Sequence, residues 1–518
     1  MGRKTFLIQF LLFSFNQVFS QSYFERIETG PGIYFGKIDH LQLAASGSGY
    51  ATGYAQYNPG NSYAGFMLLK YNEDGEMIWA RRDTLHQADI NGIYIDRFEN
   101  LYLYGGEEPS GQSLISKFDS SGNLLWSKCF ADSLYSSIYS IATNDDQVFY
   151  ATGYENNSLL LIKIDSAGNM LAPFKFFSEH SRNSTIGNQV YVRSNRIVIF
   201  SNATDSVYNW YSEVINLDLN ENLTGAYEFG NQYRDLTVTR GAMNSSGDIL
   251  ISGNLPSIQG GDDNFFISRI DANGNFLWTK IFNVAASPLD VHSFHKIADG
   301  FVLTGSKGTH PDSFVAKIDT EGNFVWAKNY EDAYHTAGVF DAIQLTNHGY
   351  ILGGILYDTT RNLLPFFINA DSTGDITCGT NDFIFSQASI TFNIDSVQLS
   401  IDSGGVEYNY PLLLVSGITD SVYCGQVGID TLLNPTNTIS VFPNPTNDEV
   451  SIRSKLYYRH STITLYNSIG ELVLQKQIAS DEVGIVSINT ENYPAGFYFL
   501  SVLANGSCAG AKVVIEHH

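Results

Sequence analysis

The chain has 518 residues, with 53 acidic and 29 basic side chains and a formal net charge of −24. This excess of negative charge repels phosphate backbones and anionic membrane surfaces, so the composition excludes nucleic-acid binding and favours solubility outside the cell. The length exceeds that of one ordinary hydrophobic core, so we expect two or three domains.

The first twenty residues have the layout of a secretory signal peptide. Arg3 and Lys4 precede the apolar run FLIQFLLFSF, and the small residue Ser20 offers a cleavage position. The apolar run is short for a bilayer span, and no later segment is apolar enough to cross a membrane. We therefore expect a signal peptide over residues 1–20, export through the general secretory translocon, and no transmembrane segment.

A short motif recurs along the chain at intervals of roughly fifty residues. The stretch DSSGNLLW from Asp119 returns as DANGNFLW from Asp271 and DTEGNFVW from Asp319. Its glycine marks seven units, at Gly75, Gly122, Gly168, Asn222, Gly274, Gly322 and Gly374, with Asn222 replacing the glycine in the weakest copy. Between the motifs, apolar and polar residues alternate as they do in half-buried strands.

Four short antiparallel strands in each of seven units predict an all-β fold, a seven-bladed β-propeller over residues 21–378. The motif then forms the hairpin turn between the third and fourth strands, where Gly122 supplies a positive φ and Trp126 packs between blades. The last unit lacks its tryptophan strand, so we predict that SYFERIET, from Ser22, provides the outer strand of the last blade. The motif resembles the Asp-box of sialidase-type propellers but differs in spacing, and it lacks the acids of a calcium loop. We interpret it as structural.

Propellers usually place their sites in loops around the central channel. Loops that lead into the first strands contain Asp89, Asp235, Asp290, His292 and Asp341. Convergent acids at such a face bind cations or sugars, but an acid also often serves only to turn its own loop. No catalytic motif, metal-ligand cluster or cofactor fingerprint is recognisable, so we assign no catalytic residue, metal or cofactor.

The segment 379–424 alternates like further strands and predicts a short β connector. Four cysteines are too few for a disulfide-built fold, but Cys378 and Cys424 flank this segment and could pair in an oxidising compartment. If they pair, we expect the connector to dock on the last blade. The following tract, 425–438, contains Asn, Thr and Pro and predicts a linker.

Residues 439–518 alternate as seven short strands, enough for a small Ig-like β-sandwich. This segment contains the ordered motifs PNP (Pro443, Asn444, Pro445), LYNSIGELV (with Gly470), PAGFYFLSV (with Pro494, Gly496 and Tyr498) and KVVI (from Lys512). It resembles the type A C-terminal sorting domain of cargo for the Bacteroidota type IX secretion system. The resemblance implies that the type IX machinery is a partner, and that the protein is secreted or attached to the outer cell surface after crossing the outer membrane.

Several Asp-Ser or Asp-Thr pairs followed by an apolar residue resemble O-glycosylation sites of the same bacteria. They would place sugars on Thr84, Ser133, Ser166, Ser206, Ser396, Ser421 and Thr431. The pair Asp-Ser is also common in turns, so both interpretations stay open.

The absence of a catalytic signature on a regular scaffold favours a module that binds a glycan or a surface protein. The alternatives are an extracellular enzyme that degrades polysaccharides or peptides, with unrecognised catalytic residues, and a structural protein of the surface layer.

Overall fold

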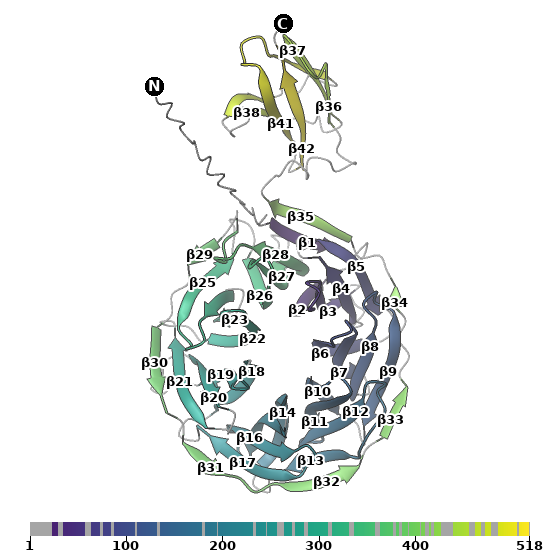
Figure 1. Cartoon of the computed structure of the whole chain (residues 1–518), viewed down its shortest axis with the longest axis vertical. Coiled ribbons are helices and arrows are strands. Elements are labelled where there is room, and N and C mark those ends of the chain that lie inside the picture. The colour runs from purple at the N-terminus through teal and green to yellow at the C-terminus, as the bar shows by residue number, and fades with distance from the viewer. Residues whose placement is uncertain are drawn as a thin grey trace, which may run out of the picture. The chain divides into compact units, whose positions relative to one another are not determined.

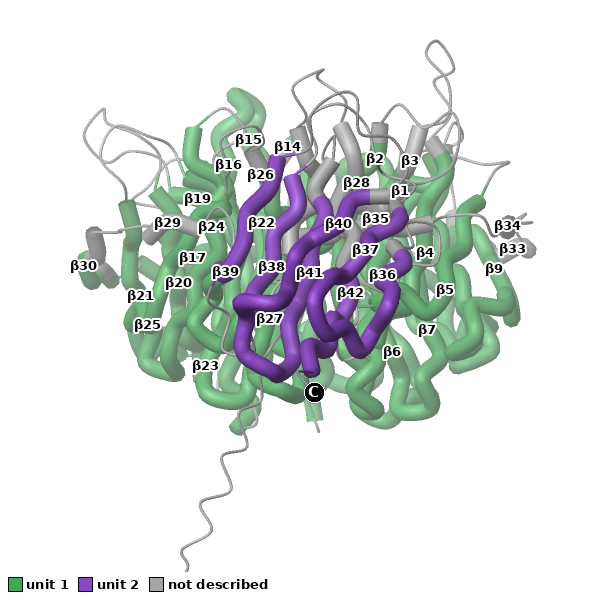
Figure 2. The backbone as a smooth tube through the Cα atoms, turned by 90° about the horizontal axis from the view of Figure 1, so that it is seen from above, with its two compact units in different colours: residues 1–425 green, residues 426–518 purple. Residues whose placement is uncertain are grey.

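Strands dominate the computed structural model of the chain, and the residues that it describes contain no helix (Figure 1). It describes residues 23–425 and 439–516 apart from 29–34, 57–63, 73–75, 84–86, 109–110, 132–134, 179–181, 194, 231–234, 245, 256–263, 272–274, 284–288, 309–312, 331–335, 358–362, 377–379, 383–385, 392, 405, 410–413, 416–418, 455–461, 468–471, 478–484 and 505–506. In this part of the chain, no helix has the length and apolar character needed to cross a membrane. The predicted signal peptide, residues 1–20, lies outside it. The chain divides into two compact units, residues 1–425 and 426–518 (Figure 2).

Four-stranded antiparallel meanders repeat around a ring in the larger unit (Figure 1). One meander consists of β6 (Gln87–Ile95), β7 (Leu101–Glu108), β8 (Gln112–Phe118) and β9 (Leu124–Ala131), ordered from the centre of the ring outward. Four similar meanders follow it: β10 (Ser136–Thr143), β11 (Val148–Glu155), β12 (Ser158–Asp165) and β13 (Phe174–Ser178); β14 (Arg182–Arg193), β15 (Arg196–Asp205), β16 (Trp210–Asp218) and β17 (Leu223–Phe229); β18 (Thr237–Met243), β19 (Ile249–Leu255), β20 (Asn264–Ile270) and β21 (Phe276–Asn283); β22 (Leu289–Ile297), β23 (Gly300–Lys307), β24 (Ser313–Ile318) and β25 (Phe324–Tyr330).

A ten-stranded sheet joins the two ends of this repeat. It contains β2 (Phe35–Leu43), β3 (Gly49–Gln56), β4 (Ala64–Tyr71) and β5 (Met77–Asp83), together with β26 (Thr336–Gln344), β27 (Tyr350–Tyr357) and β28 (Leu363–Ala370). Strand β1 (Tyr23–Glu28) pairs antiparallel with β28, Phe24 opposite Ile368. The prediction that the residues from Ser22 supply the outer strand of the last unit is therefore confirmed.

A fifth strand lies on the outer edge of every meander, along the outer rim in Figure 1. The segment 380–425, which we call the belt, supplies these strands while running backward around the ring. Its strands are β29 (Thr380–Asp382) on β25, β30 (Ser386–Ile390) on β21, β31 (Ile394–Ser396) on β17, β32 (Ser400–Gly404) on β13, β33 (Val406–Asn409) on β9, β34 (Leu414–Val415) on β5 and β35 (Thr419–Gly425) on β1. The expectation that this segment docks on the last blade alone is wrong. Each four-stranded meander leaves an unpaired outer edge, and the belt satisfies all of these edges in turn.

The recurring motif is a hairpin turn, as predicted. In the copy between β8 and β9, the N–H of Asp119 donates to the carbonyl of Asn123 (2.9 Å), and the Gly122 N–H donates to the carbonyl of Asp119 (3.0 Å). Gly122 has a φ of 78°, and a Cβ there would lie 2.7 Å from the ring of Trp79 on β5. The same contact joins Trp126 to Gly168, Trp278 to Gly322 and Trp326 to Gly374. Each tryptophan thus packs against the turn of the next unit, which confirms the predicted packing between units.

In the weakest copy of the motif, the prediction that Asn222 takes the place of the glycine is wrong by one residue. The residue with positive φ is Glu221 (64°), whose N–H donates to the Asp218 carbonyl (3.0 Å) as that of Gly122 does to Asp119. Asn222 instead donates its side-chain amide to the Asp218 carboxylate (2.9 Å) and so corresponds to Asn123. Asparagine adopts left-handed conformations more often than glutamate does, so residue type alone did not reveal the shift.

The smaller unit contains two antiparallel sheets that share one core. The three-stranded sheet consists of β36 (Ile439–Phe442), β37 (Glu449–Ser454) and β40 (Ile485–Asn489), and the four-stranded sheet of β39 (Leu472–Gln477), β38 (Thr462–Asn467), β41 (Gly496–Ala504) and β42 (Ser507–Ile515). Buried residues of both sheets pack together, including Ile452, Ile488, Leu465, Leu500 and Val513. The alternation that predicted strands here places these aliphatic side chains on the inner faces.

Candidate functional site

The innermost strand of each meander carries a β-bulge at the same position. The pairing register shifts between Ile38 and His40 on β2, Ile90 and Gly92 on β6, Ile138 and Ser140 on β10, Gly187 and Gln189 on β14, Val238 and Arg240 on β18, Val291 and Ser293 on β22, and Val339 and Asp341 on β26. A bulge inserts one residue and redirects the side chains beside it. Because the bulges recur at one level of the ring, the side chains they redirect are brought together.

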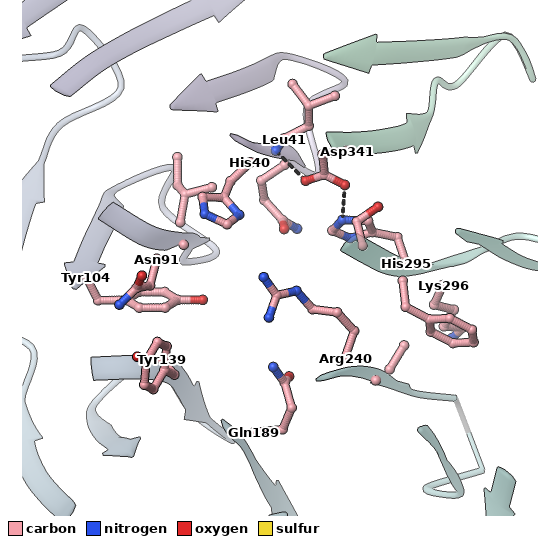
Figure 3. A pocket seen from close by; sticks show the side chains of 17 residues that line it. His40, Leu41, Asn91, Tyr104, Tyr139, Gln189, Arg240, His295, Lys296 and Asp341 are labelled. Carbon is pink, nitrogen blue, oxygen red and sulfur yellow. Dashed lines mark hydrogen bonds and ion pairs between the residues drawn. The ribbon is translucent and has the colours of Figure 1, made fainter. Parts of the chain in front are cut away.

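These side chains line a cavity of about 190 Å³ inside the ring (Figure 3). Its polar lining includes His40, Gln42, Asn91, Tyr104, Tyr139, Gln189, Arg240, His295, Lys296 and Asp341. Gln42, Tyr104 and Gln189 also line a second, adjoining cavity with a more aliphatic wall. The described residues contain no group of three or more His, Cys, Asp or Glu side chains that could hold a metal ion.

A buried ion pair forms one wall of the cavity. The carboxylate of Asp341, 2 % exposed, accepts hydrogen bonds from His295 Nε2 (2.7 Å) and from the backbone N–H of Leu41 (2.7 Å). Burial opposes the charge on Asp341, but His295 and the Leu41 N–H outweigh it and hold the pKa of the carboxyl below its usual value. Burial likewise opposes the charge on His295, but the Asp341 carboxylate raises the pKa of the imidazole. Each partner therefore favours the charged form of the other.

A second acid–base pair lies beside this wall. Lys37 Nζ is 2.7 Å from the Asp39 carboxylate and 5.0 Å from the ring centroids of Tyr54 and Phe340. Burial raises the pKa of Asp39 to about 6 despite the lysine. The neighbouring His40 ring contacts the Ile90 carbonyl (3.2 Å), and burial together with the positive charge of Arg240 lowers its pKa to about 3. His40 is therefore neutral at physiological pH.

The guanidinium of Arg240 points into the cavity between Tyr104 and Gln189 (Figure 3). Its Nε donates to the His292 carbonyl (2.8 Å) and its Nη1 to the Thr239 carbonyl (3.1 Å). Two backbone carbonyls thus hold the side chain in place. Within the described part of the chain, Arg240 forms no ion pair.

The Tyr104 hydroxyl reaches the cavity because residue 92 is a glycine. A Cβ on Gly92 would collide with this hydroxyl. Among the described residues, the Tyr104 hydroxyl makes no hydrogen bond. Burial raises the pKa of Tyr104 to about 12, so the hydroxyl keeps its proton and remains a donor.

The sequence candidates occupy different environments. Asp341 lines the cavity, and the His292 ring packs edge-on against Phe340, the residue before Asp341 (5.3 Å between centroids). Asp290 is exposed and accepts a hydrogen bond from Asn254 (2.8 Å). Asp235 is exposed in a turn and accepts from the Trp210 N–H (2.9 Å), and Asp89 is exposed on β6. The structure therefore does not bring Asp89, Asp235 and Asp290 together in the cavity lining.

Sequence reasoning did not find Arg240, His295, His40 or Tyr104. A usable signal was present in the inner strands: an aliphatic residue followed by two non-aliphatic ones, as in Ile38–His40 and Val238–Arg240. Such a break in the alternation marks a bulge.

Two of the sorting motifs, PNP and KVVI, meet at the edge of β42. The Asn444 side chain donates to the Lys512 carbonyl (2.7 Å) and accepts from the Val514 N–H (2.7 Å), while Pro443 and Pro445 flank it. The Tyr498 hydroxyl donates to the Pro494 carbonyl (2.8 Å), and Gly496 is extended. Lys512 Nζ lies 3.9 Å from the ring centroid of Phe497. Gly470 lies outside the described residues.

A family of secretion domains matches this unit. Residues 440–516 match the family described as the secretion system C-terminal sorting domain. The chain is cargo of the type IX secretion system. Its sorting domain directs it to the cell surface or the extracellular space, as the sequence motifs predicted.

Comparisons with other proteins add only weak likenesses. No curated protein sequence matches the chain significantly. A protein of unknown function from Dyadobacter fermentans is 9% identical, with a TM-score of 0.39, covering 67% of this chain and 98% of its own. A Synechocystis apocarotenoid oxygenase is 10% identical (TM-score 0.39, 73% and 97% covered), and the phage phi92 endosialidase is also 10% identical (TM-score 0.34, 95% and 87%). Likenesses at these identities and TM-scores do not indicate a function for this chain.

Several remaining predictions fall on residues whose side chains the structure does not describe. Cys378, Thr84, Ser133 and Thr431 lie outside the described residues, and for Cys424, Ser396 and Ser421 only the backbone, in belt strands, is described. Of the other two glycosylation candidates, Ser206 is exposed and Ser166 half-buried. Both follow an aspartate that caps its own turn, Asp205 and Asp165. The disulfide and glycosylation remain predictions.

Proposed function

We propose that the chain is a secreted or surface-attached binding protein built on a seven-bladed β-propeller. In this proposal a signal peptide (1–20) precedes the propeller (21–378), and the connector 379–424 adds an outer strand to each blade. A linker (425–438) leads to the sorting domain (439–518), an Ig-like β-sandwich. The meanders of four strands, ordered outward from a common centre, support this architecture.

We further propose that the cavity inside the ring binds one small polar ligand, such as a single sugar unit at the end of a glycan. The observation that carries this proposal is the alignment of the bulges, which directs polar side chains of several strands toward one space. Pockets that hold drug-sized ligands measure roughly 300–1,000 Å³, so a cavity of about 190 Å³ fits a smaller ligand.

Glycan-array screening of the secreted full-length protein, followed by calorimetry, tests the binding function. Tyr104→Phe keeps the ring and removes a hydroxyl that faces the cavity, so we expect an affinity loss of roughly tenfold, the value of one hydrogen bond. Tyr208→Phe, at a ring that is 73% exposed, is the matched control and should bind like the parent protein. Absence of binding to any glycan or peptide ligand, or equal binding by Tyr104→Phe and the parent, contradicts the proposal.

One observation favours a second candidate function, hydrolysis or elimination on a polysaccharide. His295 is oriented by the buried Asp341, as general bases are oriented in many enzymes. Product release from polysaccharides by the parent protein, lost in His295→Gln, would support the enzyme.

A further inference from the structure

We infer that the ligand of this cavity carries one negatively charged oxyanion group, a carboxylate or a sulfate ester, and that Arg240 anchors it. The inference rests on the proposed binding function and names the class of its ligand.

The first support is the unusual position of the Arg240 guanidinium. Arginine keeps its charge at all physiological pH values and carries five N–H donors. Two of its nitrogens donate to the backbone carbonyls of His292 and Thr239, which fixes the plane of the group. The rest of the guanidinium faces the cavity (Figure 3), and no carboxylate among the described residues pairs with it. Charges inside proteins are normally paired, so the ligand is the natural source of the missing anion.

The second support is the charge balance of the groups around Arg240. Asp341 is matched by His295 (2.7 Å) and Asp39 by Lys37 (2.7 Å), and His40 is neutral. Arg240 therefore contributes a positive charge that these groups do not compensate. Lys296, exposed at the cavity wall, adds a second positive charge. Asp89 is exposed on β6, and its negative charge raises the pKa of Asp39. This is notable in a chain with a net charge of −24.

The third support is the geometry of the neighbouring donors. A guanidinium forms two parallel hydrogen bonds with a carboxylate or a sulfate, and this match gives specificity as well as affinity. The Tyr104 hydroxyl, which has no partner among the described residues, is available for a third oxygen of the same ligand. Because a single fixed cation faces the centre of the cavity, a group with one negative charge suits it better than a doubly charged phosphate monoester.

Calorimetry of the secreted full-length protein with matched sugars tests this inference. The probes are glucuronate against glucose, galacturonate against galactose, and glucose 6-sulfate against glucose. We expect at least one acid to bind tenfold or more tightly than its neutral partner, and the pair that shows this difference distinguishes a carboxylate from a sulfate ligand. Arg240→Gln should remove the difference, and Arg240→Lys, which keeps the charge but not the paired donors, should retain part of it. Arg97→Gln, at a side chain that is 59% exposed and does not line the cavity, is the matched control and should leave the difference intact.

The outcomes separate this inference from the function on which it rests. If neutral sugars bind as tightly as their acids, or if Arg240→Gln keeps the preference, the anion inference is wrong while the binding function stands. If no ligand of any kind binds, both are wrong. Should Arg240→Gln fail to fold, as its thermal midpoint would reveal, the comparison of acid with neutral sugar in the parent protein and in Arg240→Lys still decides.

Discussion

Replacement of Gly322 by alanine tests why the recurring motif needs its glycine. Gly322 has a φ of 73°, and an added Cβ would lie 2.5 Å from the ring of Trp278 in the preceding meander. Gly247 is a matched control, because it occupies a turn with the same two backbone hydrogen bonds and a φ of 84°, yet has no atom within 4 Å of its Cβ position. Gly247→Ala therefore measures the backbone strain alone, which we expect to cost about 1–2 kcal/mol. Gly322→Ala adds the overlap with the tryptophan, about 1–3 kcal/mol more.

Urea unfolding followed by tryptophan fluorescence measures these free energies. The five tryptophans, Trp79, Trp126, Trp210, Trp278 and Trp326, all belong to the larger unit, so the signal reports its unfolding without a contribution from the smaller one. In a double-mutant cycle, Trp278→Ala should relieve the extra cost of Gly322→Ala, because the overlapping ring is gone. Equal destabilisation by Gly322→Ala and Gly247→Ala, or additive effects of Gly322→Ala and Trp278→Ala, would refute the packing argument.

Three further predictions concern acid stability, the belt and the sorting domain. Burial holds the pKa of His40 at about 3, below its usual 6.5, so the unfolded chain takes up a proton first and stability falls as the pH drops from 6.5 towards 3; the raised pKa of Asp39 opposes this between its usual 3.8 and about 6. His40→Gln should therefore flatten the loss of urea resistance on acidification, and an unchanged pH profile would contradict the assignment. A chain truncated after residue 376 exposes the outer sheet edges and should aggregate in light scattering, whereas truncation after 425 should leave a monodisperse protein; equal behaviour of the two would count against the belt as edge protection. Asn444→Ala removes two hydrogen bonds to β42 and should destabilise the smaller unit by about 1–3 kcal/mol and reduce export. Ser440→Ala, at an exposed residue of β36, is its control, and immunoblots of the culture medium provide the readout.

Local pattern was enough to predict the strands, the hairpin turns and the role of the tryptophans. The spacing of Asp119, Gly122 and Trp126 encodes a turn followed by a strand, and both features depend on residues close in sequence. The position of β1 on β28 was also predictable, because a missing outer strand at one end of the repeat matched a spare strand at the other.

The partners of the belt and the lining of the cavity depend on contacts that no local pattern records. Alternation shows that residues 380–425 form strands, but backbone hydrogen bonds are the same at every sheet edge, so the sequence does not say which edge each strand joins. Arg240 and His295 lie far apart in sequence and line one cavity only because the inner strands of consecutive meanders lie side by side. Asp290 and Asp341 look alike as acids near the start of a strand, but Asp341 comes directly after the bulge of β26, whereas Asp290 precedes the bulge of β22.

The pairing of β35 with β1 determines how the larger unit carries mechanical load. β35 ends at Gly425, where the chain leaves for the sorting domain, and Gly425 lies opposite Tyr23 at the other end of this unit. β1 is itself held by β28. A pull transmitted from the C-terminal side, as flow would exert on a protein tethered at that end, is therefore resisted first by backbone hydrogen bonds between β35 and β1. The strand that completes the last unit, β1, therefore also holds the strand that leads to the sorting domain, and tension would load the β35–β1 pairing before any of the meanders.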